Sequence, residues 1–133
     1  MVTLHVEKNI DSIDDNKISL IIEFIKYVIK SYKLSTPFKL HLVNGRKTPI
    51  TTTACYSPST GDVHINVKDR LLLVDILRSI AHELAHHKQN ELGMLNEKSG
   101  DDTSKEEGVA NRIAGIMIRR FGKIHDKIYG AQS

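Results

Sequence analysis

Residues 79–88 read SIAHELAHHK and contain the pattern HExxH, with His82, Glu83 and His86 in its three fixed positions. On a helix, side chains four residues apart share one face, with Cβ atoms about 5–6 Å apart, so His82 and His86 can reach one metal ion. Neutral imidazoles suit zinc, and Glu83, one position further round the helix, can serve as the general base for a water that the metal activates. The pattern predicts a metal-dependent hydrolytic site.

The residues on either side of this motif predict one long amphipathic helix. We expect it to begin at Asp69, a residue typical of helix N-caps, and to end at Gly93, which is typical of the position after a helix. Its apolar residues recur at helical spacing and form a stripe that a core can bury, namely Leu73, Leu77, Ile80 and Leu84. His82 and His86 project from another side of the helix, at about 100° per residue. The alternative to a metal site is that these histidines are solvated or hydrogen-bonded within the protein.

Length and composition predict a single domain. The chain has 133 residues, and we expect one domain over 1–133, with a core about 12–121 and a C-terminal tail 123–133. Hydrophobic residues make up 40% and charged residues 26%, which is ordinary for a globular protein. The net charge is +3 and the chain has no long basic run, so nucleic acid is not expected as a partner.

The cysteine content and the N-terminus predict a cytoplasmic location. Cys55 is the single cysteine, so an internal disulfide and a cysteine-rich structural zinc site are excluded. Residues 1–7 lack the basic and apolar regions of a secretory signal, and the most apolar run, 18–29, is too short to span a membrane and carries two charges. We therefore expect no membrane partner. Oligomeric state is not indicated.

The remaining elements predict an α+β fold. A capping box at Ser12 and apolar residues at helical spacing indicate a first helix that ends near Leu34, before Pro37. Alternation then predicts strands over 38–43, 49–56 and 63–67, with a hairpin signal at residues 44–45. Residues 1–10 read as a short strand or an extended arm. The prediction is an N-terminal helix, a three-stranded mainly antiparallel sheet, the HExxH helix, and a glutamate-bearing helix from Thr103 or Ser104 to Phe121, stopped by Gly122.

A catalytic zinc usually has three protein ligands, so one more ligand is needed. No histidine lies between His87 and His125, and His87 points elsewhere on the helix, as a surface or core-edge residue does. Among the carboxylates, Glu107 fits best, because Asn111 lies one turn further on and can hydrogen-bond a zinc-bound histidine. The alternatives are Glu106 and, less favoured, Asp101 or Asp102. Capping boxes with Thr103 or Ser104 compete for Glu106 and Glu107.

The motifs HELAH at 82–86 and EGVAN at 107–111 together resemble those of the gluzincin zinc peptidases. The compact order of elements is similar to that of the small minigluzincins and of the ImmA/IrrE-type peptidase core, over roughly residues 38–121. This resemblance implies a small zincin-like domain with one zinc ion per chain, bound by His82, His86 and Glu107. It implies Glu83 as general base and acid, and Asn111 as support for the ligands. The chain departs from the larger gluzincins in lacking a substantial C-terminal subdomain.

The expected function is that of a zinc-dependent endopeptidase acting on a peptide or protein substrate in extended form. The substrate would pair with an edge strand, either 51–56 or 63–67. Candidates for stabilising the oxyanion or contacting substrate are Tyr56, His64, His125 and Tyr129. Cys55 is either a small buried residue or a thiolate that blocks the metal's open position. The alternative function is a zinc-binding regulatory or interaction module without turnover, including one associated with nucleic acid.

Overall fold

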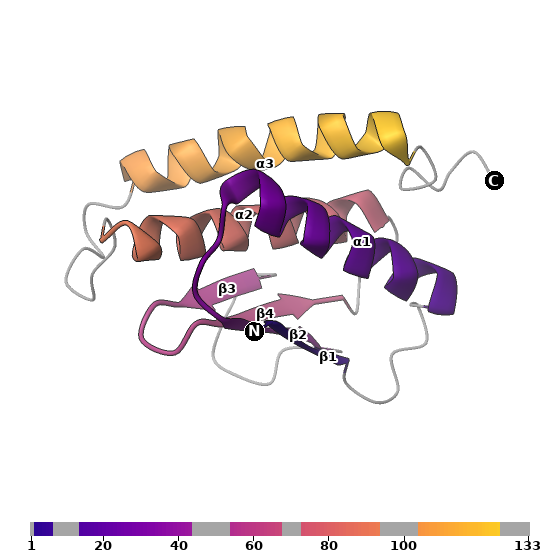
Figure 1. Cartoon of the computed structure of the whole chain (residues 1–133), viewed down its shortest axis with the longest axis horizontal. Helices are drawn as coiled ribbons and strands as arrows, with labels where there is room; N and C mark the ends of the chain where they lie inside the picture. Colours follow the sequence, from indigo (N-terminus) through magenta and orange to yellow (C-terminus); the bar gives the residue numbers. More distant parts are fainter. Residues whose placement is uncertain (1, 7–13, 44–53, 68–72, 94–103, 126–133) are drawn as a thin grey trace.

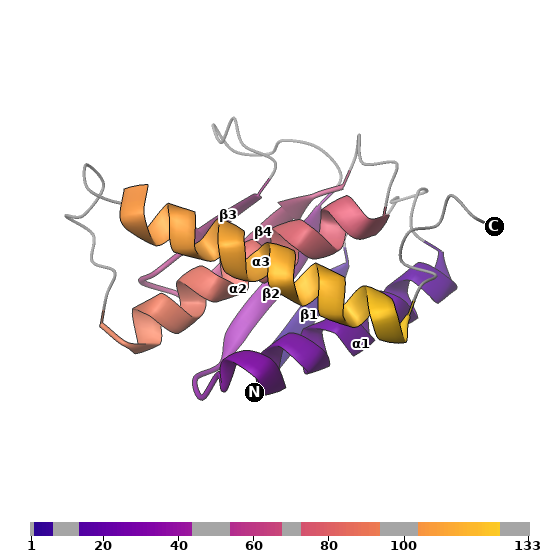
Figure 2. The same cartoon turned by 90° about the horizontal axis from the view of Figure 1, so that it is seen from above.

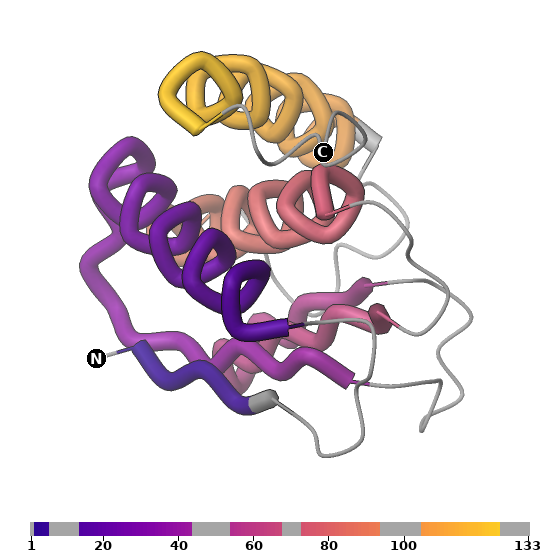
Figure 3. Tube along the Cα trace, turned by 90° about the vertical axis from the view of Figure 1, so that its right-hand side faces the viewer, coloured from indigo at the N-terminus to yellow at the C-terminus, as the bar shows by residue number. Residues whose placement is uncertain are grey.

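The computed structural model describes residues 2–6, 14–43, 54–67, 73–93 and 104–125. Within these ranges the chain forms four strands and three helices, in the order β1 (Val2–Val6), α1 (Asp15–Tyr32), β2 (Phe38–Val43), β3 (Ala54–Ser57), β4 (Asp62–Asn66), α2 (Leu73–Glu91) and α3 (Ser104–Ile124). The helices lie on one side of the sheet, and α3 lies over α2 on the side away from the strands (Figures 1 and 3). None of these helices is long and apolar enough to cross a membrane.

The sheet is mixed, in the order β1-β2-β4-β3. The β1–β2 and β2–β4 pairs are parallel, and only the β3–β4 pair is antiparallel. The expected three-stranded, mainly antiparallel sheet is therefore wrong in strand number and in direction, whereas the α+β class is confirmed. The pattern of alternation showed which faces are buried but not which strand pairs with which. The hairpin signal at residues 44–45 falls outside the described residues.

The β3–β4 hairpin closes at Gly61, which has a positive φ of 76°. The Gly61 amide donates to the Ser57 carbonyl over 2.9 Å. A Cβ atom at this position would lie 3.3 Å from the Pro37 carbonyl oxygen, so glycine satisfies both the backbone angle and the close approach of β2. This turn places β4 antiparallel beside β3.

The core fills the space between the sheet and the helices. All four residues of the predicted α2 stripe are buried, together with Leu40, Leu42, Val63 and Ile65 from the central strands. In α3, Ala110 and Ala114 are buried, and their small side chains leave room for α3 to approach α2. Phe24 of α1 packs edge-on against Phe121 of α3, with ring centroids 5.0 Å apart, so the two outer helices also meet.

The helix ends differ in part from the predictions. Asp14, rather than Ser12, caps α1, and its carboxylate accepts from the Lys17 amide over 2.8 Å. Gly93 follows α2 with a φ of 73°, as expected of a helix-ending glycine. Gly122 does not stop α3, which continues to Ile124; Gly122 itself is buried, and Lys123 and Ile124 are exposed. Ser12, Asp69 and Thr103 lie outside the described residues.

Candidate metal centre

The candidate centre forms where α3 lies across α2 (Figure 2). The apolar stripe of α2 faces the sheet, and this orientation turns His82 and His86 toward the first turns of α3, which carry Glu107. One ligand atom from each of these three residues lies within 4.8 Å of the others, and they form the one such group among the described residues. We call His82, His86 and Glu107 the triad.

The triad atoms converge closely. His82 Nε2 lies 3.1 Å from Glu107 Oε2, and His86 Nε2 lies 2.7 Å from Glu107 Oε1. The two imidazoles are nearly perpendicular, with their ring centroids 4.8 Å apart. The His86 side chain is only 9% exposed, whereas that of Glu107 is 48% exposed. The triad is therefore buried at its α2 ligand His86 and accessible to solvent at its α3 ligand Glu107.

In its neutral form, the His86 imidazole presents an unprotonated nitrogen to the triad. Its Nδ1 lies 2.8 Å from Gln89 Oε1, and the Gln89 Nε2 donates to the Glu106 carbonyl over 3.0 Å, which fixes the amide orientation. Nδ1 therefore carries the proton of the neutral ring, and Nε2 carries a lone pair. His86 Nε2 is buried and has no hydrogen-bond partner among the described residues, although Glu107 Oε1 is close. Two such acceptor atoms repel each other unless they share a cation, so the residues fit a metal ion.

Glu83 lies beside this cluster. Its carboxylate is buried, with Oε2 4.0 Å from His82 Nε2. The pKa of Glu83 is raised to about 7: burial has the largest effect and raises it, the neighbouring His86 lowers it, and the Glu107 carboxylate raises it. A carboxylate of this kind can take up and release a proton near neutral pH.

His82 remains neutral at lower pH than an ordinary histidine. Burial, and then the neighbouring His86, lower the pKa of His82 more than the Glu107 carboxylate and the Asn111 side chain raise it. Neutral imidazole is the form that binds a metal. The Asn111 side chain hydrogen-bonds the His82 imidazole, which is the contact that the spacing predicted.

Tyr56 and His64 are not brought into the triad. The Tyr56 hydroxyl lies 2.7 Å from His87 Nδ1 and accepts from the Asn90 amide over 3.1 Å. His64 alternates with the buried residues Val63 and Ile65, so it points to the sheet face away from the helices. There its ring stacks on His41, which stacks in turn on His5.

The other candidates are also separated from the triad or lie outside the described residues. His125 follows the end of α3, about 27 Å from Glu107 at 1.5 Å per residue, and its ring packs against Phe121. Glu106 lies next to Glu107 in sequence but is not part of the triad. Three of the candidates lie outside the described residues, namely Tyr129, Asp101 and Asp102. Burial and the charge of Glu83 raise the pKa of the Cys55 thiol, so the thiol is protonated in the metal-free protein.

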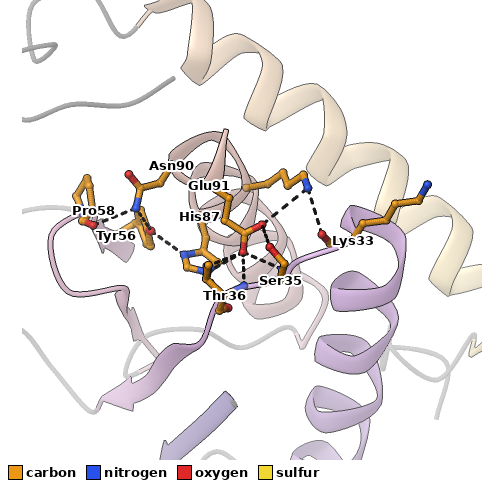
Figure 4. Close-up of polar contacts among 9 residues, drawn as sticks. Lys33, Ser35, Thr36, Tyr56, Pro58, His87, Asn90 and Glu91 are labelled. Atoms are coloured by element: carbon orange, nitrogen blue, oxygen red, sulfur yellow. Dashed lines mark hydrogen bonds and ion pairs between the residues drawn. The ribbon is translucent and has the colours of Figure 1, made fainter. Parts of the chain in front are cut away.

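Sequence reasoning missed two polar residues of α2. His87, placed at the surface or core edge, is 3% exposed, and its Nε2 lies 2.9 Å from Thr36 Oγ1 (Figure 4). Gln89 is 5% exposed and contacts the triad through His86. The spacing of three residues between His86 and Gln89 was a signal that could have found the second contact.

Comparison of the chain with protein-family models, with curated proteins and with solved structures gave no match. The gluzincin resemblance therefore remains an expectation drawn from the two motifs. The function must be inferred from the geometry of the site.

Proposed function

We propose that the protein is a zinc-dependent endopeptidase of the gluzincin type. The observation that carries this proposal is the triad itself, in which the buried lone pair of His86 Nε2 faces a Glu107 oxygen at 2.7 Å without a hydrogen bond. Two imidazoles and one carboxylate form a typical three-ligand set for catalytic zinc, which leaves one position open for water or substrate. We infer one ion per chain, in a small zincin-like domain.

Each residue of the site has a separate task in this proposal. Bound zinc would polarise the scissile carbonyl and make a water molecule more acidic. The Glu83 carboxylate takes the proton from that water and later delivers it to the leaving amine. In the metal-free protein the pKa of Glu83 is about 7. Asn111 orients the His82 ring through its hydrogen bond.

The sheet limits where an extended substrate can pair. β4 lies between β2 and β3, so the expected option of pairing along 63–67 is excluded, because both edges of that strand are occupied. β3 is an edge strand and packs beside α2. We therefore propose that a peptide or protein substrate adds to the β3 edge, with main-chain hydrogen bonds that hold its backbone across the site. Tyr56, His64 and His125 make their contacts outside the triad, so this proposal assigns the oxyanion to none of them. We place this activity in the reducing cytoplasm, where Cys55 stays a free thiol.

The proposal is tested by metal content and turnover in matched variants. We expect about one zinc per chain in the parent, loss of zinc in Glu107→Ala, and retention of zinc without casein hydrolysis in Glu83→Gln. Glu23→Ala is the control, because Glu23 is an exposed carboxylate on α1. Zinc retained fully in Glu107→Ala would show that the third ligand is wrong. Zinc bound by a parent that hydrolyses no protein substrate would favour the non-catalytic zinc module.

A further inference from the structure

Gln89 is a buried amide that contacts both helices of the metal centre. It lies on α2 three residues after His86 and is 5% exposed. Its oxygen contacts the His86 ring over 2.8 Å, and its nitrogen contacts the α3 backbone over 3.0 Å. We infer that Gln89 is a positioning residue that fixes the His86 tautomer and holds α3 at the distance that the metal requires. This inference rests on the proposed zinc function.

The first contact determines which nitrogen of His86 is available. A side-chain amide has one acceptor end and one donor end. Because the carbonyl of Glu106 can only accept, the Gln89 nitrogen must face it, and the Gln89 oxygen must face His86 Nδ1. His86 thereby donates through Nδ1 and keeps Nε2 unprotonated toward Glu107. A partner on the outer nitrogen of a metal-binding histidine fixes the ring and raises its basicity as a ligand.

The second contact determines where Glu107 lies. Glu106 immediately precedes Glu107, and its carbonyl lies in the first turn of α3, which begins at Ser104. A carbonyl oxygen has two lone pairs, so it can accept from Gln89 and still accept the helical bond from Ala110. The Glu107 side chain is 48% exposed, so side-chain packing holds it only weakly. The bond from Gln89 therefore anchors the backbone that carries the third ligand.

His82 and His86 differ in how they are held. The His82 ring hydrogen-bonds Asn111, which lies on the same helix as Glu107. The His86 ring donates to Gln89, which lies on its own helix and extends across to α3. Gln89 is thus the amide that couples the orientation of one ligand to the position of another. Its loss should weaken metal binding even when both helices stay folded.

The test compares Gln89→Met, which removes both contacts at similar volume, with Gln89→Glu, which keeps the acceptor toward His86. Asn90→Leu is the matched control, because Asn90 is the neighbouring α2 amide, and it contacts Tyr56 and Pro58 instead of the triad. Zinc affinity is measured by competition with a chromophoric chelator. We expect binding to weaken by about 10–100-fold in Gln89→Met, to recover in part in Gln89→Glu, and to stay at the parent value in Asn90→Leu.

Nitrogen-15 NMR of the histidine side chains in the presence of excess chelator provides a readout that needs no metal. We expect the Nδ1–H tautomer of His86 in the parent and in Gln89→Glu, and loss of that preference in Gln89→Met. Circular dichroism checks that each variant is folded. Parent-like zinc affinity and an unchanged tautomer in Gln89→Met would overturn the inference. A parent that binds no zinc overturns the proposed function instead, and the tautomer measurement still decides the role of Gln89 toward His86.

Discussion

At the scale of one residue, ionisation of the candidate catalytic group Glu83 lowers the free energy of unfolding. Its carboxylate is buried among other acidic and imidazole groups, so ionisation is less favourable in the folded state than in the unfolded state. The pKa of Glu83 is raised from 4.5 to about 7. A group with a raised folded-state pKa contributes stability fully below its unfolded pKa, and this contribution is lost as the pH rises through the folded value.

The corresponding prediction concerns Glu83→Gln in the presence of excess chelator. We expect the variant to gain stability over the parent as the pH rises from 5 to 8, because glutamine never ionises. The shift in pKa corresponds to a difference of about 3 kcal/mol in unfolding free energy at pH 8. Urea unfolding at both pH values measures it. An identical difference between variant and parent at pH 5 and pH 8 would contradict the raised pKa.

At the scale of an element, the C-terminal end of α2 joins the HExxH helix to the connection between α1 and β2. Glu91 accepts from the backbone amides of Ser35 and Thr36 over 2.9 and 2.7 Å (Figure 4). The Thr36 hydroxyl also lies 2.6 Å from Glu91 and 2.9 Å from His87. α2 therefore carries the core stripe, with this anchor at its C-terminal end, on one side and the triad histidines on another.

We predict that Glu91→Ala lowers the free energy of unfolding by about 2–4 kcal/mol, because several hydrogen bonds to a charged acceptor are lost at once. Urea unfolding measures the change. Glu23→Ala serves as the control, since it removes an exposed glutamate from α1 with an expected effect within about 0.5 kcal/mol. Equal effects of the two substitutions would show that Glu91 is not an anchor.

A second prediction at this scale concerns Gly115, which lies within α3. A Cβ atom at this position would meet nothing within 4 Å, and the residue has no positive φ. Gly115→Ala should therefore stabilise the protein by about 0.5–1 kcal/mol through helix propensity alone. Thermal unfolding measures the gain, and zinc affinity should not change. Gly61→Ala should instead destabilise the protein, because the positive φ and the nearby Pro37 carbonyl both oppose a side chain at this position.

At the scale of the whole molecule, the proposed metal would join parts of the chain that are distant in sequence. The triad combines α2 with α3, and α3 also packs on α1 through Phe121. A ligand that binds only the folded state stabilises the whole domain by mass action. The metal centre and the stability of the fold should therefore be coupled.

We predict that zinc raises the melting temperature of the parent, with a gain of about 2.7 kcal/mol in unfolding free energy at a free zinc concentration 100 times the dissociation constant. Differential scanning calorimetry measures the shift. Glu107→Ala should show a much smaller gain, and magnesium should not replace zinc, because imidazole ligands suit zinc better. A gain of equal size in Glu107→Ala would show that zinc binds elsewhere.

The sequence by itself determined the features that depend on local spacing. The helical period accounts for the shared face of the histidines at i and i+4, for the apolar stripe of α2 and for the small residues of α3. The same spacing predicted Glu107 and the hydrogen bond between His82 and Asn111. The stop expected at Gly122 was wrong, because α3 continues to Ile124, and a single glycine costs a helix only about 1 kcal/mol relative to alanine.

Only the tertiary structure decided the features that depend on contacts between distant segments. Strand alternation has the same period whichever neighbour a strand has, so it could not reveal that β2 pairs with β4 in parallel. The burial of His87 and the reach of Gln89 to α3 depend likewise on how α2 packs against its neighbours. Side-chain spacing fixes a face of one helix, but packing alone determines what that face meets.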